Sequence, residues 1–247
     1  MTQLFSRPSS LKDVQTHFCP GCHHGSIHSL VARAMDSFGI AGETIGCASV
    51  GCSVFLYNYF HIDVVESPHG RAPAVATGVK RARPDRIVFS YQGDGDLAAI
   101  GTSEIIHAAN RGEMITVIFV NNTTYGMTGG QMAPTTMPGQ KTTTSPNGRN
   151  VVNDGKPFRM AELLSNLDGV AYSARIAVNS PKNIIQAKRA IKTAFQYQVE
   201  KKGFAFIEAL AACPTNWGMN PLVANERVGN EMIPYFPLGV FKNNDNL

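Results

Sequence analysis

The sequence has little charge for its length and no long hydrophobic segment. Of its 247 residues, 16% are charged, with 22 Lys plus Arg against 18 Asp plus Glu. This weak and scattered positive excess argues against a nucleic-acid-binding protein. The longest largely apolar run, residues 114–120, is far too short to span a membrane, and residues 1–13 lack the apolar core of a signal peptide. We therefore expect a cytoplasmic protein that binds neither nucleic acid nor membrane.

Cysteine is also scarce, with five residues in the whole chain. Disulfides are rare in the reducing interior of a cell, so a disulfide-stabilised scaffold is excluded. The 43% of apolar residues are ample for a core, and the low charge indicates that a partner covers part of the surface. Composition leaves open what purpose the five cysteines serve.

Hydrophobic periodicity predicts alternating strands and helices. Residues 86–91 and 114–120 have the pattern of short buried strands, and residues 97–110 between them have that of a helix. Strand, helix and strand with short connections form the βαβ unit of a parallel sheet. We therefore predict an α/β fold with helices on both faces of a parallel sheet, built as a single domain over residues 1–247. The other predicted segments are an arm (1–25), helices (26–38, 71–83, 162–167, 181–201), a long polar loop (123–154), strands (171–178, 204–210) and an irregular tail (214–247).

Two polar clusters directly follow the two strands of this βαβ unit. Residues 93–96, GDGD, follow the first strand, and residues 121–122, NN, follow the second. Because parallel strands bind ligands at their carboxyl ends, both clusters should face one crevice. Asp94, Asn122 and a backbone carbonyl near Thr124 are oxygen ligands that suit a Mg²⁺ ion holding a diphosphate. Each cluster alone is compatible with an ordinary turn, but the spaced pair resembles the thiamine-diphosphate motif.

The cysteines have a spacing that indicates a metal site. Cys19 and Cys22 form a C-x2-C pair, and Cys213 follows the last predicted strand, at the edge where the crevice should lie. With Cys52 they would supply four thiolates, which suit either Zn²⁺ or an iron–sulfur cluster. The alternative is that Cys47, Cys52 and Cys213 are ordinary buried residues, and this alternative is strongest for Cys47. Four nearby histidines are interpreted as solvated, or as contacts of the ligands, rather than as metal ligands: His17, His23, His24 and His28.

Six segments, taken in order, resemble the β subunit of the 2-oxoacid:ferredoxin oxidoreductases. The resemblance runs through most of the chain and implies the diphosphate-binding half of a thiamine enzyme. The implied cofactors are thiamine diphosphate, Mg²⁺ and one [4Fe–4S] cluster. The segments are CPGC (19–22), VGCS (50–53), HGRA (69–72), YQGDGDLAAIG (91–101), VNNTTYGMTGGQMAPT (120–135) and ACPT (212–215).

The resemblance also implies roles for individual residues. Cluster ligands fall on Cys19, Cys22, Cys52 and Cys213, and Mg²⁺ ligands fall on Asp94, Asn122 and the backbone of Thr124. His69 and Arg71 would be catalytic residues in the crevice. Cofactor binding is implied for Cys52, Ser53, His69, Gly70, Gly93, Asp94, Gly95, Asp96, Asn122, Thr124, Tyr125, Gly126, Met127 and Thr128.

The implied reaction is the CoA-dependent oxidative decarboxylation of a 2-oxoacid to an acyl-CoA and CO₂, with electrons passing through the cluster to ferredoxin. The pyrimidine-binding half of the active site would come from a separate α subunit, with γ and δ subunits as further candidate partners. Val54 and Phe55 occupy a region that is basic in some relatives that prefer 2-oxoglutarate. Unless they are simple packing residues, they favour a branched-chain substrate such as 2-oxoisovalerate, and residues 126–136 also look most like that branch.

Three alternatives remain open at this point. The chain could be the β subunit of a 2-oxoglutarate:ferredoxin oxidoreductase. It could instead be half of a non-redox thiamine-dependent decarboxylase whose cysteines hold zinc. It could also be a structural, zinc-binding subunit without any cofactor. Iron content and thiamine diphosphate binding would separate these possibilities.

Overall fold

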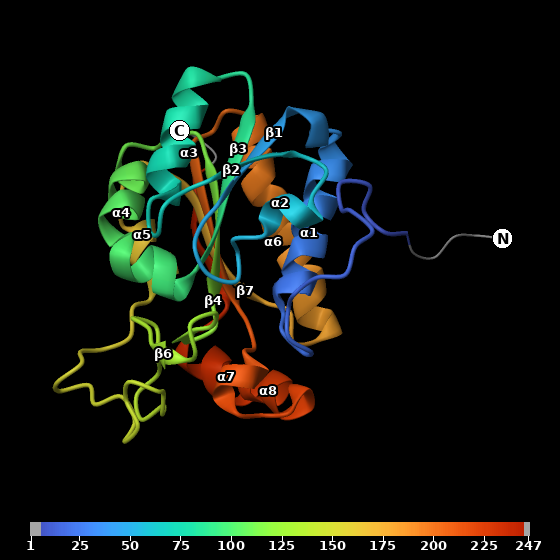
Figure 1. Cartoon of the computed structure of the whole chain (residues 1–247). Coiled ribbons are helices and arrows are strands. Elements are labelled where there is room, and N and C mark those ends of the chain that lie inside the picture. The colour runs from blue at the N-terminus through green and yellow to red at the C-terminus, as the bar shows by residue number, and fades with distance from the viewer. Residues whose placement is uncertain (1–5, 245–247) are drawn as a thin grey trace.

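The computed structural model describes residues 6–244, so the first five residues of the predicted arm and the last three of the predicted tail lie outside it. One seven-stranded sheet has the order β2-β1-β3-β4-β8-β7-β9. Every neighbouring pair is parallel except β7 and β9, which are antiparallel (Figure 1). The predicted α/β fold with a parallel sheet is therefore confirmed. The strands are β1 (Thr44–Ala48), β2 (Asp63–Glu66), β3 (Ile87–Gly93), β4 (Thr116–Asn121), β7 (Val170–Ala177), β8 (Phe204–Leu210) and β9 (Gly239–Asn243).

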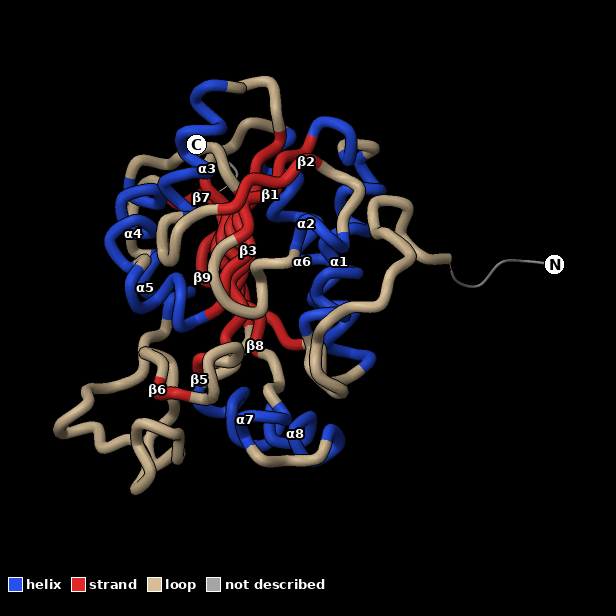
Figure 2. Tube along the Cα trace, viewed as in Figure 1, coloured by secondary structure: helices blue, strands red, loops and turns tan. Residues whose placement is uncertain are grey.

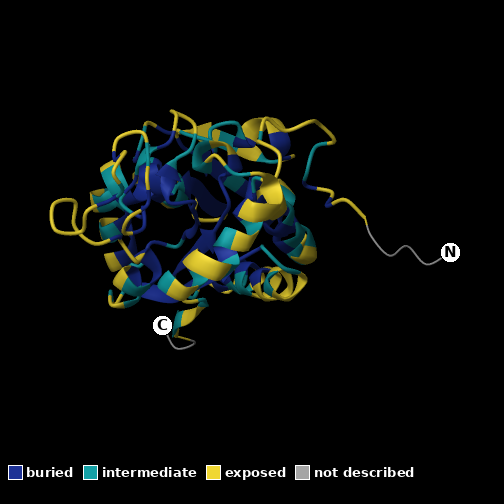
Figure 3. Ribbon diagram, turned by 90° about the horizontal axis from the view of Figure 1, so that it is seen from below, coloured by how far each residue is buried: buried dark blue, intermediate teal, exposed yellow. Residues whose placement is uncertain are grey.

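Helices cover both faces of this sheet, as predicted. Successive residues of a strand point to opposite faces, so Phe89 of β3 packs in one core and Val88 in the other. The first core is closed by α1 and α6, and the second by α3, α4 and α5. Buried residues fill the middle of the molecule, and exposed ones lie on the outer faces of the helices (Figure 3). These helices are α1 (His24–Phe38), α3 (Ala72–Ala82), α4 (Thr102–Asn110), α5 (Met160–Ser165) and α6 (Pro181–Val199).

The two longest helices begin and end where their local sequence directs. Ser180 accepts a hydrogen bond from the backbone N–H of Asn183, and Pro181 follows in the first turn of α6. Helix α1 ends at Gly39, whose φ of 66° is the left-handed conformation that glycine adopts readily. These capping residues explain why the predicted ranges lie within two residues of the observed ones.

The predicted helix over residues 97–110 is interrupted in its first half. It starts as a π-helical turn, η2 (Asp96–Ile100), and only then continues as α4. The interruption lies where another backbone approaches, because a Cβ added at Gly101 would lie 2.7 Å from the carbonyl oxygen of Gly70. Such π turns are often found at functional sites.

The prediction of an irregular tail from residue 214 is wrong. Asn220 caps α8 by accepting hydrogen bonds from Leu222 and Val223, and Pro221 starts that helix. A third core forms where Ala224 and Phe236 of this region pack against Leu210 at the end of β8. The elements of the tail are α7 (Pro214–Trp217), α8 (Pro221–Arg227), η3 (Val228–Met232), α9 (Ile233–Tyr235) and β9.

The long loop that follows β4 lies at the same end of the sheet as α7 and α8 (Figure 2). Its only strands are the two-residue β5 (Thr124–Tyr125) and β6 (Gln131–Met132), which pair with each other. The remaining short elements are η1 (Ala41–Glu43) and α2 (Leu56–Tyr59). No helix within residues 6–244 has the length and apolar character needed to cross a membrane.

Candidate functional site

A surface pocket opens at the carboxyl ends of the parallel strands β1, β3 and β4. It gathers all but one of the residues for which cofactor binding was implied, and the missing one is Gly70. His24, Val50 and Gly51 line it as well. The full lining is His24, Val50, Gly51, Cys52, Ser53, His69, Gly93, Asp94, Gly95, Asp96, Asn122, Thr124, Tyr125, Gly126, Met127 and Thr128.

Asp94 is the buried acid of this pocket. One carboxylate oxygen, Oδ1, accepts a hydrogen bond of 2.9 Å from the backbone N–H of Gly95, and Oδ2 accepts one from the hydroxyl of Thr135. Burial raises the pKa of the Asp94 carboxyl to about 7, and these hydrogen bonds oppose the rise. A nearby cation would stabilise the ionised form. Together with the amide of Asn122 in the same pocket, this carboxylate fits a Mg²⁺ ion.

The turn after β4 contributes Asn122 and Thr124 to the same pocket as Asp94. The Oδ1 of Asn122 accepts a hydrogen bond of 3.3 Å from the backbone N–H of Thr124. Between them, Thr123 has a φ of 61°, which is uncommon for a residue with a branched side chain. Strained backbone of this kind persists where the surrounding structure holds it, and it is concentrated at functional sites.

The glycines of the pocket allow close approach of the backbone. A Cβ added at Gly95 would lie 2.4 Å from the ring of Tyr125, so no other residue fits there without a shift. Gly126 is similarly enclosed, because a Cβ there would lie 3.2 Å from the sulfur of Cys52. Glycine at these two positions therefore lets the backbone pack closely against Tyr125 and Cys52 at the pocket.

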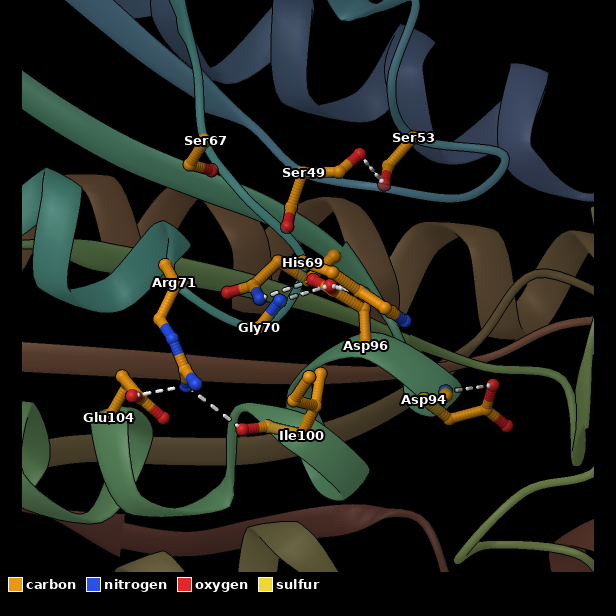
Figure 4. A network of polar contacts seen from close by, with 12 residues as sticks. Ser49, Ser53, Ser67, His69, Gly70, Arg71, Asp94, Asp96, Ile100 and Glu104 are labelled. Atoms are coloured by element: carbon orange, nitrogen blue, oxygen red, sulfur yellow. Dashed lines mark hydrogen bonds and ion pairs between the residues drawn. The ribbon is translucent and has the colours of Figure 1, made fainter.

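His69 and Arg71 take different positions (Figure 4). His69 lines the pocket with 36% of its side chain exposed, and its Nδ1 contacts the buried carboxylate of Asp96. Arg71 does not line the pocket. Its guanidinium donates to the carboxylate of Glu104 and, at 3.1 Å, to the carbonyl of Ile100. The structure therefore brings His69 to the cofactor residues and leaves Arg71 outside them.

Four of the five cysteines lie near one another beside the pocket. A Cβ on Gly126 would lie 3.2 Å from the sulfur of Cys52 and 3.9 Å from that of Cys213. Burial raises the pKa of the Cys22 thiol to about 12, and nearby Cys213, Cys52 and Cys19 act in the same direction. Among the residues that the structure describes, no three His, Cys, Asp or Glu side chains form a group that could hold a metal ion.

Cys47 is separate from the other cysteines. It lies in the middle of β1 and is fully buried in the second hydrophobic core, with Val88 and Ala76. Burial alone raises its pKa to about 12. Its position agrees with the interpretation of Cys47 as a packing residue.

Helix α7 connects Cys213 to the pocket. The side-chain amide of Asn216 donates to the carbonyl oxygen of Gly126 at 2.6 Å and to the sulfur of Cys213 at 3.2 Å. The indole N–H of Trp217 donates to the carbonyl oxygen of Asn122 at 3.2 Å. These contacts join Cys213 to the segment that contains Asn122 and Gly126.

Comparison with known proteins agrees with this geometry. The family described as thiamine pyrophosphate enzyme, C-terminal TPP binding domain, matches residues 44–209. The chain is 43% identical over 202 residues to the 2-oxoglutarate synthase subunit KorB of Methanocaldococcus jannaschii, covering 81% of this chain and 70% of that protein. It is 48% identical over 239 residues to the ketoisovalerate oxidoreductase subunit VorA of Methanothermobacter thermautotrophicus. The chain belongs to the 2-oxoacid:ferredoxin oxidoreductase family.

A solved member of this family has the same fold. The structure of the 2-oxoglutarate:ferredoxin oxidoreductase from Magnetococcus marinus with 2-oxoglutarate, coenzyme A and succinyl-CoA bound has a TM-score of 0.81 and 28% identity to this chain. The match covers 99% of this chain and 87% of that one. The match to VorA covers 97% of this chain, which spans 50% of that relative's length. The predicted thiamine-diphosphate-binding fold and the predicted family are confirmed.

His24 also lines the pocket, although the sequence did not single it out as a pocket residue. Its side chain is buried, stacks on Phe18 with 4.9 Å between ring centroids, and its Nδ1 lies 2.8 Å from the hydroxyl of Tyr91. Burial lowers the pKa of His24 to about 3, so the imidazole is neutral. Ile27 and His28 are buried on the same side of α1. Their spacing from residue 24 was the signal for its burial.

The structure also shows the surroundings of two further residues near the site, His23 and Phe55. His23 lies between two segments, since its Nδ1 accepts from the backbone N–H of Ala212 at 3.3 Å and its Nε2 lies 3.1 Å from the side-chain oxygen of Asn225. It is buried rather than solvated, and its pKa is lowered by that burial. Phe55 packs against His17, with 4.9 Å between ring centroids, and is not among the pocket residues.

Proposed function

We propose that this chain is the subunit of a 2-oxoacid:ferredoxin oxidoreductase that binds thiamine diphosphate and an iron–sulfur cluster, and that residues 1–247 act as one domain. The complex would convert a 2-oxoacid, coenzyme A and oxidised ferredoxin into an acyl-CoA, CO₂ and reduced ferredoxin. One observation carries the proposal: a buried acid and two glycine-rich turns meet at a pocket whose wall includes Cys52, next to Cys213.

In this proposal, three residues at the pocket bind Mg²⁺. Asp94, Asn122 and the backbone carbonyl of Thr124 would hold Mg²⁺, and the ion would hold the diphosphate. Gly95 and Gly126 would let the backbone approach the phosphates. Asp96 would orient His69, whose imidazole it contacts at the pocket. When bound, thiamine diphosphate supplies an electron sink for the loss of CO₂ from a 2-oxoacid.

Cys19, Cys22, Cys52 and Cys213 would hold a [4Fe–4S] cluster, in which each thiolate binds a different iron, so that no three of them need to surround a single ion. Cys52 belongs to both parts of the site, because it lines the pocket and lies near Cys213. This proximity would place the cluster beside the bound cofactor. When bound, the cluster supplies a one-electron redox centre whose potential depends on its burial and its hydrogen bonds.

A partner subunit would complete the active site. Val50 and Met127 line the pocket while remaining 41% and 44% exposed. Exposed apolar side chains around a pocket are typical of a surface that another protein covers. We assign this surface to an α subunit that carries the pyrimidine-binding half, and we expect γ and δ subunits and ferredoxin to bind elsewhere.

A branched-chain 2-oxoacid such as 2-oxoisovalerate is the favoured substrate. The support is the 48% identity to the ketoisovalerate enzyme subunit, together with the apolar Val50 and Met127 in the pocket wall. The second candidate is 2-oxoglutarate, because the chain is 43% identical to a 2-oxoglutarate synthase subunit and covers 70% of its length.

The experiment is anaerobic purification of the chain with its natural partner subunits, followed by analysis and assay. We expect iron and acid-labile sulfide in equal amounts, bound thiamine diphosphate, and CoA-dependent reduction of ferredoxin that is fastest with 2-oxoisovalerate. A panel that includes 2-oxoglutarate and pyruvate tests the substrate. Zinc without iron, or absence of bound thiamine diphosphate, would refute the redox proposal.

A further inference from the structure

Two neighbouring threonines of the long loop contact both segments that are proposed to hold Mg²⁺. These segments, called the magnesium-type turns, are residues 94–95 after β3 and residues 122–124 after β4. The hydroxyl of Thr135 donates to the Oδ2 of Asp94, in the turn after β3. The hydroxyl of Thr136 donates, at 2.6 Å, to the carbonyl oxygen of Thr123, in the turn after β4. Both threonines and Thr123 are completely buried. Water therefore cannot replace either hydrogen bond if a hydroxyl is removed.

A buried arginine fixes the backbone on both sides of these hydroxyls. The Nη1 of Arg149 donates to the carbonyl oxygens of Ala133, Pro134 and Thr136, at 3.2, 2.9 and 2.8 Å. Its Nε donates at 3.0 Å to the carbonyl of Gly155, at the far end of the loop. Arg149 is 6% exposed. A planar guanidinium offers five N–H donors in a rigid arrangement, so it can hold several carbonyls in fixed positions.

The strands alone do not set these orientations. Pairing of β3 with β4 aligns the backbone up to Gly93 and Val120, and both turns lie beyond the last paired residues. The strained φ of Thr123 also needs an external contact to hold it. The loop contacts supply what the sheet does not: Thr135 and Thr136 contact the two turns, and the Nε2 of Gln140 also donates to the Thr123 carbonyl at 3.2 Å.

We infer that Thr135, Thr136 and Arg149 are positioning residues that hold Asp94 and the Thr123 turn in the arrangement a divalent cation requires. Arg149 fixes the backbone of residues 134–136, Thr135 orients the Asp94 carboxylate, and Thr136 orients the Thr123 carbonyl. This inference rests on the proposed function, because it takes Asp94 and the turn after β4 as the ligands of the ion. It assigns the long loop a task in metal binding.

The test uses Mn²⁺ as a spectroscopic substitute for Mg²⁺. The full chain is purified with its partner subunits and stripped of metal and cofactor. Free Mn²⁺ is then measured by electron paramagnetic resonance at saturating thiamine diphosphate. In Thr135→Val, which keeps the side-chain shape and removes the hydroxyl, we expect Mn²⁺ binding to weaken by about 10-fold to 100-fold. Thr135→Ser keeps the hydroxyl and should bind within a few-fold of the wild type.

A matched control lies in the same loop. The hydroxyl of Thr142 bonds to that of Ser145 at 2.6 Å, and this contact involves neither turn. Thr142→Val therefore removes a hydrogen bond of the same kind, and we expect wild-type affinity for Mn²⁺. Equal weakening in Thr142→Val and Thr135→Val would show a general loosening of the loop and would overturn the inference.

A double variant tests whether Arg149 acts through Thr135. Arg149→Lys keeps the charge but loses the rigid set of donors, and we expect weaker Mn²⁺ binding. Combined with Thr135→Val, its effect should be smaller than the sum of the two, because both changes disturb the same contact. Fully additive effects would contradict the inference.

The outcomes separate this inference from the proposed function. If the wild-type complex binds no Mn²⁺ in the presence of thiamine diphosphate, the proposed function fails. If the wild type binds and Thr135→Val binds equally well, only the positioning role fails. Should Thr135→Val not fold, Thr136→Val carries the same expected weakening and the same overturning result.

Discussion

The magnesium-type turns and the cysteine site are built in opposite ways. The turns directly follow two adjacent strands, β3 and β4, with one helix between them in the chain. The cysteines come from three segments that are far apart in sequence: residues 19–22, residue 52 and residue 213. A neighbouring pair of strands therefore brings the first set together and one loop orients it, whereas the second set requires segments from distant parts of the fold. The two sites should consequently respond differently to mutation.

The largest expected effect is the loss of the cluster from a cysteine variant. In Cys22→Ser we expect little or no iron and acid-labile sulfide, because one of the proposed ligands is removed. Cys47→Ser is the matched control, since Cys47 lies in the hydrophobic core away from the other four. The measurement is iron and sulfide content after anaerobic purification. Equal loss from both variants would show that the assignment of four ligands and one packing residue is wrong.

The next effect concerns the other site. Asp94→Ala should abolish the stabilisation that Mg²⁺ and thiamine diphosphate give together, which is about 2.7 kcal/mol at a ligand concentration of 100 times Kd. Iron content should stay at the wild-type level, because Asp94 belongs to the turns and not to the cysteines. Thermal unfolding with and without both ligands measures the first quantity. An unchanged ligand-induced shift would exclude Asp94 as a ligand.

The pH dependence of stability follows from the buried carboxyl. The pKa of Asp94 is raised from 3.8 to about 7 by burial, so the metal-free folded state holds its proton more tightly than the unfolded chain. The stability that this protonated carboxyl contributes is fully present when the pH is below 3.8, its pKa in the unfolded chain. It is lost as the pH rises through about 7, its pKa in the folded state. We expect the metal-free protein to lose about 2 kcal/mol between pH 5 and pH 7 relative to Asp94→Asn. Denaturant titrations of both proteins test this, and parallel curves would contradict it.

The smallest effect is expected where the two sites touch. Asn216→Ala removes the N–H donors to the sulfur of Cys213 and to the carbonyl of Gly126. Hydrogen bonds to cluster sulfurs affect the reduction potential, so we expect the variant to have a lower midpoint potential. Its affinity for Mn²⁺ should change only a few-fold. Asn220→Ala, which removes the cap of α8, is the control for a loss of local stability. Identical potentials in both variants would show that Asn216 does not influence the cluster.

The sequence predicted those parts of the fold that local patterns determine. Residues 204–210 form β8 with the predicted bounds. A short apolar run that directly follows a strong helix is typical of a strand buried on both faces in a parallel sheet. The positions of GDG and NN at the ends of two strands were predicted for the same reason, and Gly93 and Asn121 are the last residues of β3 and β4.

Other parts depend on contacts between distant segments. The tail was predicted as irregular because its helices are short, and they are stabilised by packing on the end of β8. Arg71 stands next to Gly70 in the sequence, yet Glu104 and Ile100 hold it outside the pocket. The five carbonyl contacts of Arg149 follow from no local pattern, because they depend on how a long loop folds back on itself.

Helix α8 has a consequence for the order in which the site can form during synthesis. Its Pro221 packs against Gly21 of the CPGC turn, where an added Cβ would lie 2.5 Å from the proline ring. Its Asn225 contacts His23 in the same region. Cys19 and Cys22 therefore meet their contacts from α8 only after residue 225 has been made. Enclosure of any group by Cys19 and Cys22 must therefore follow translation of α8, so we expect its insertion to be a late step in the maturation of this site.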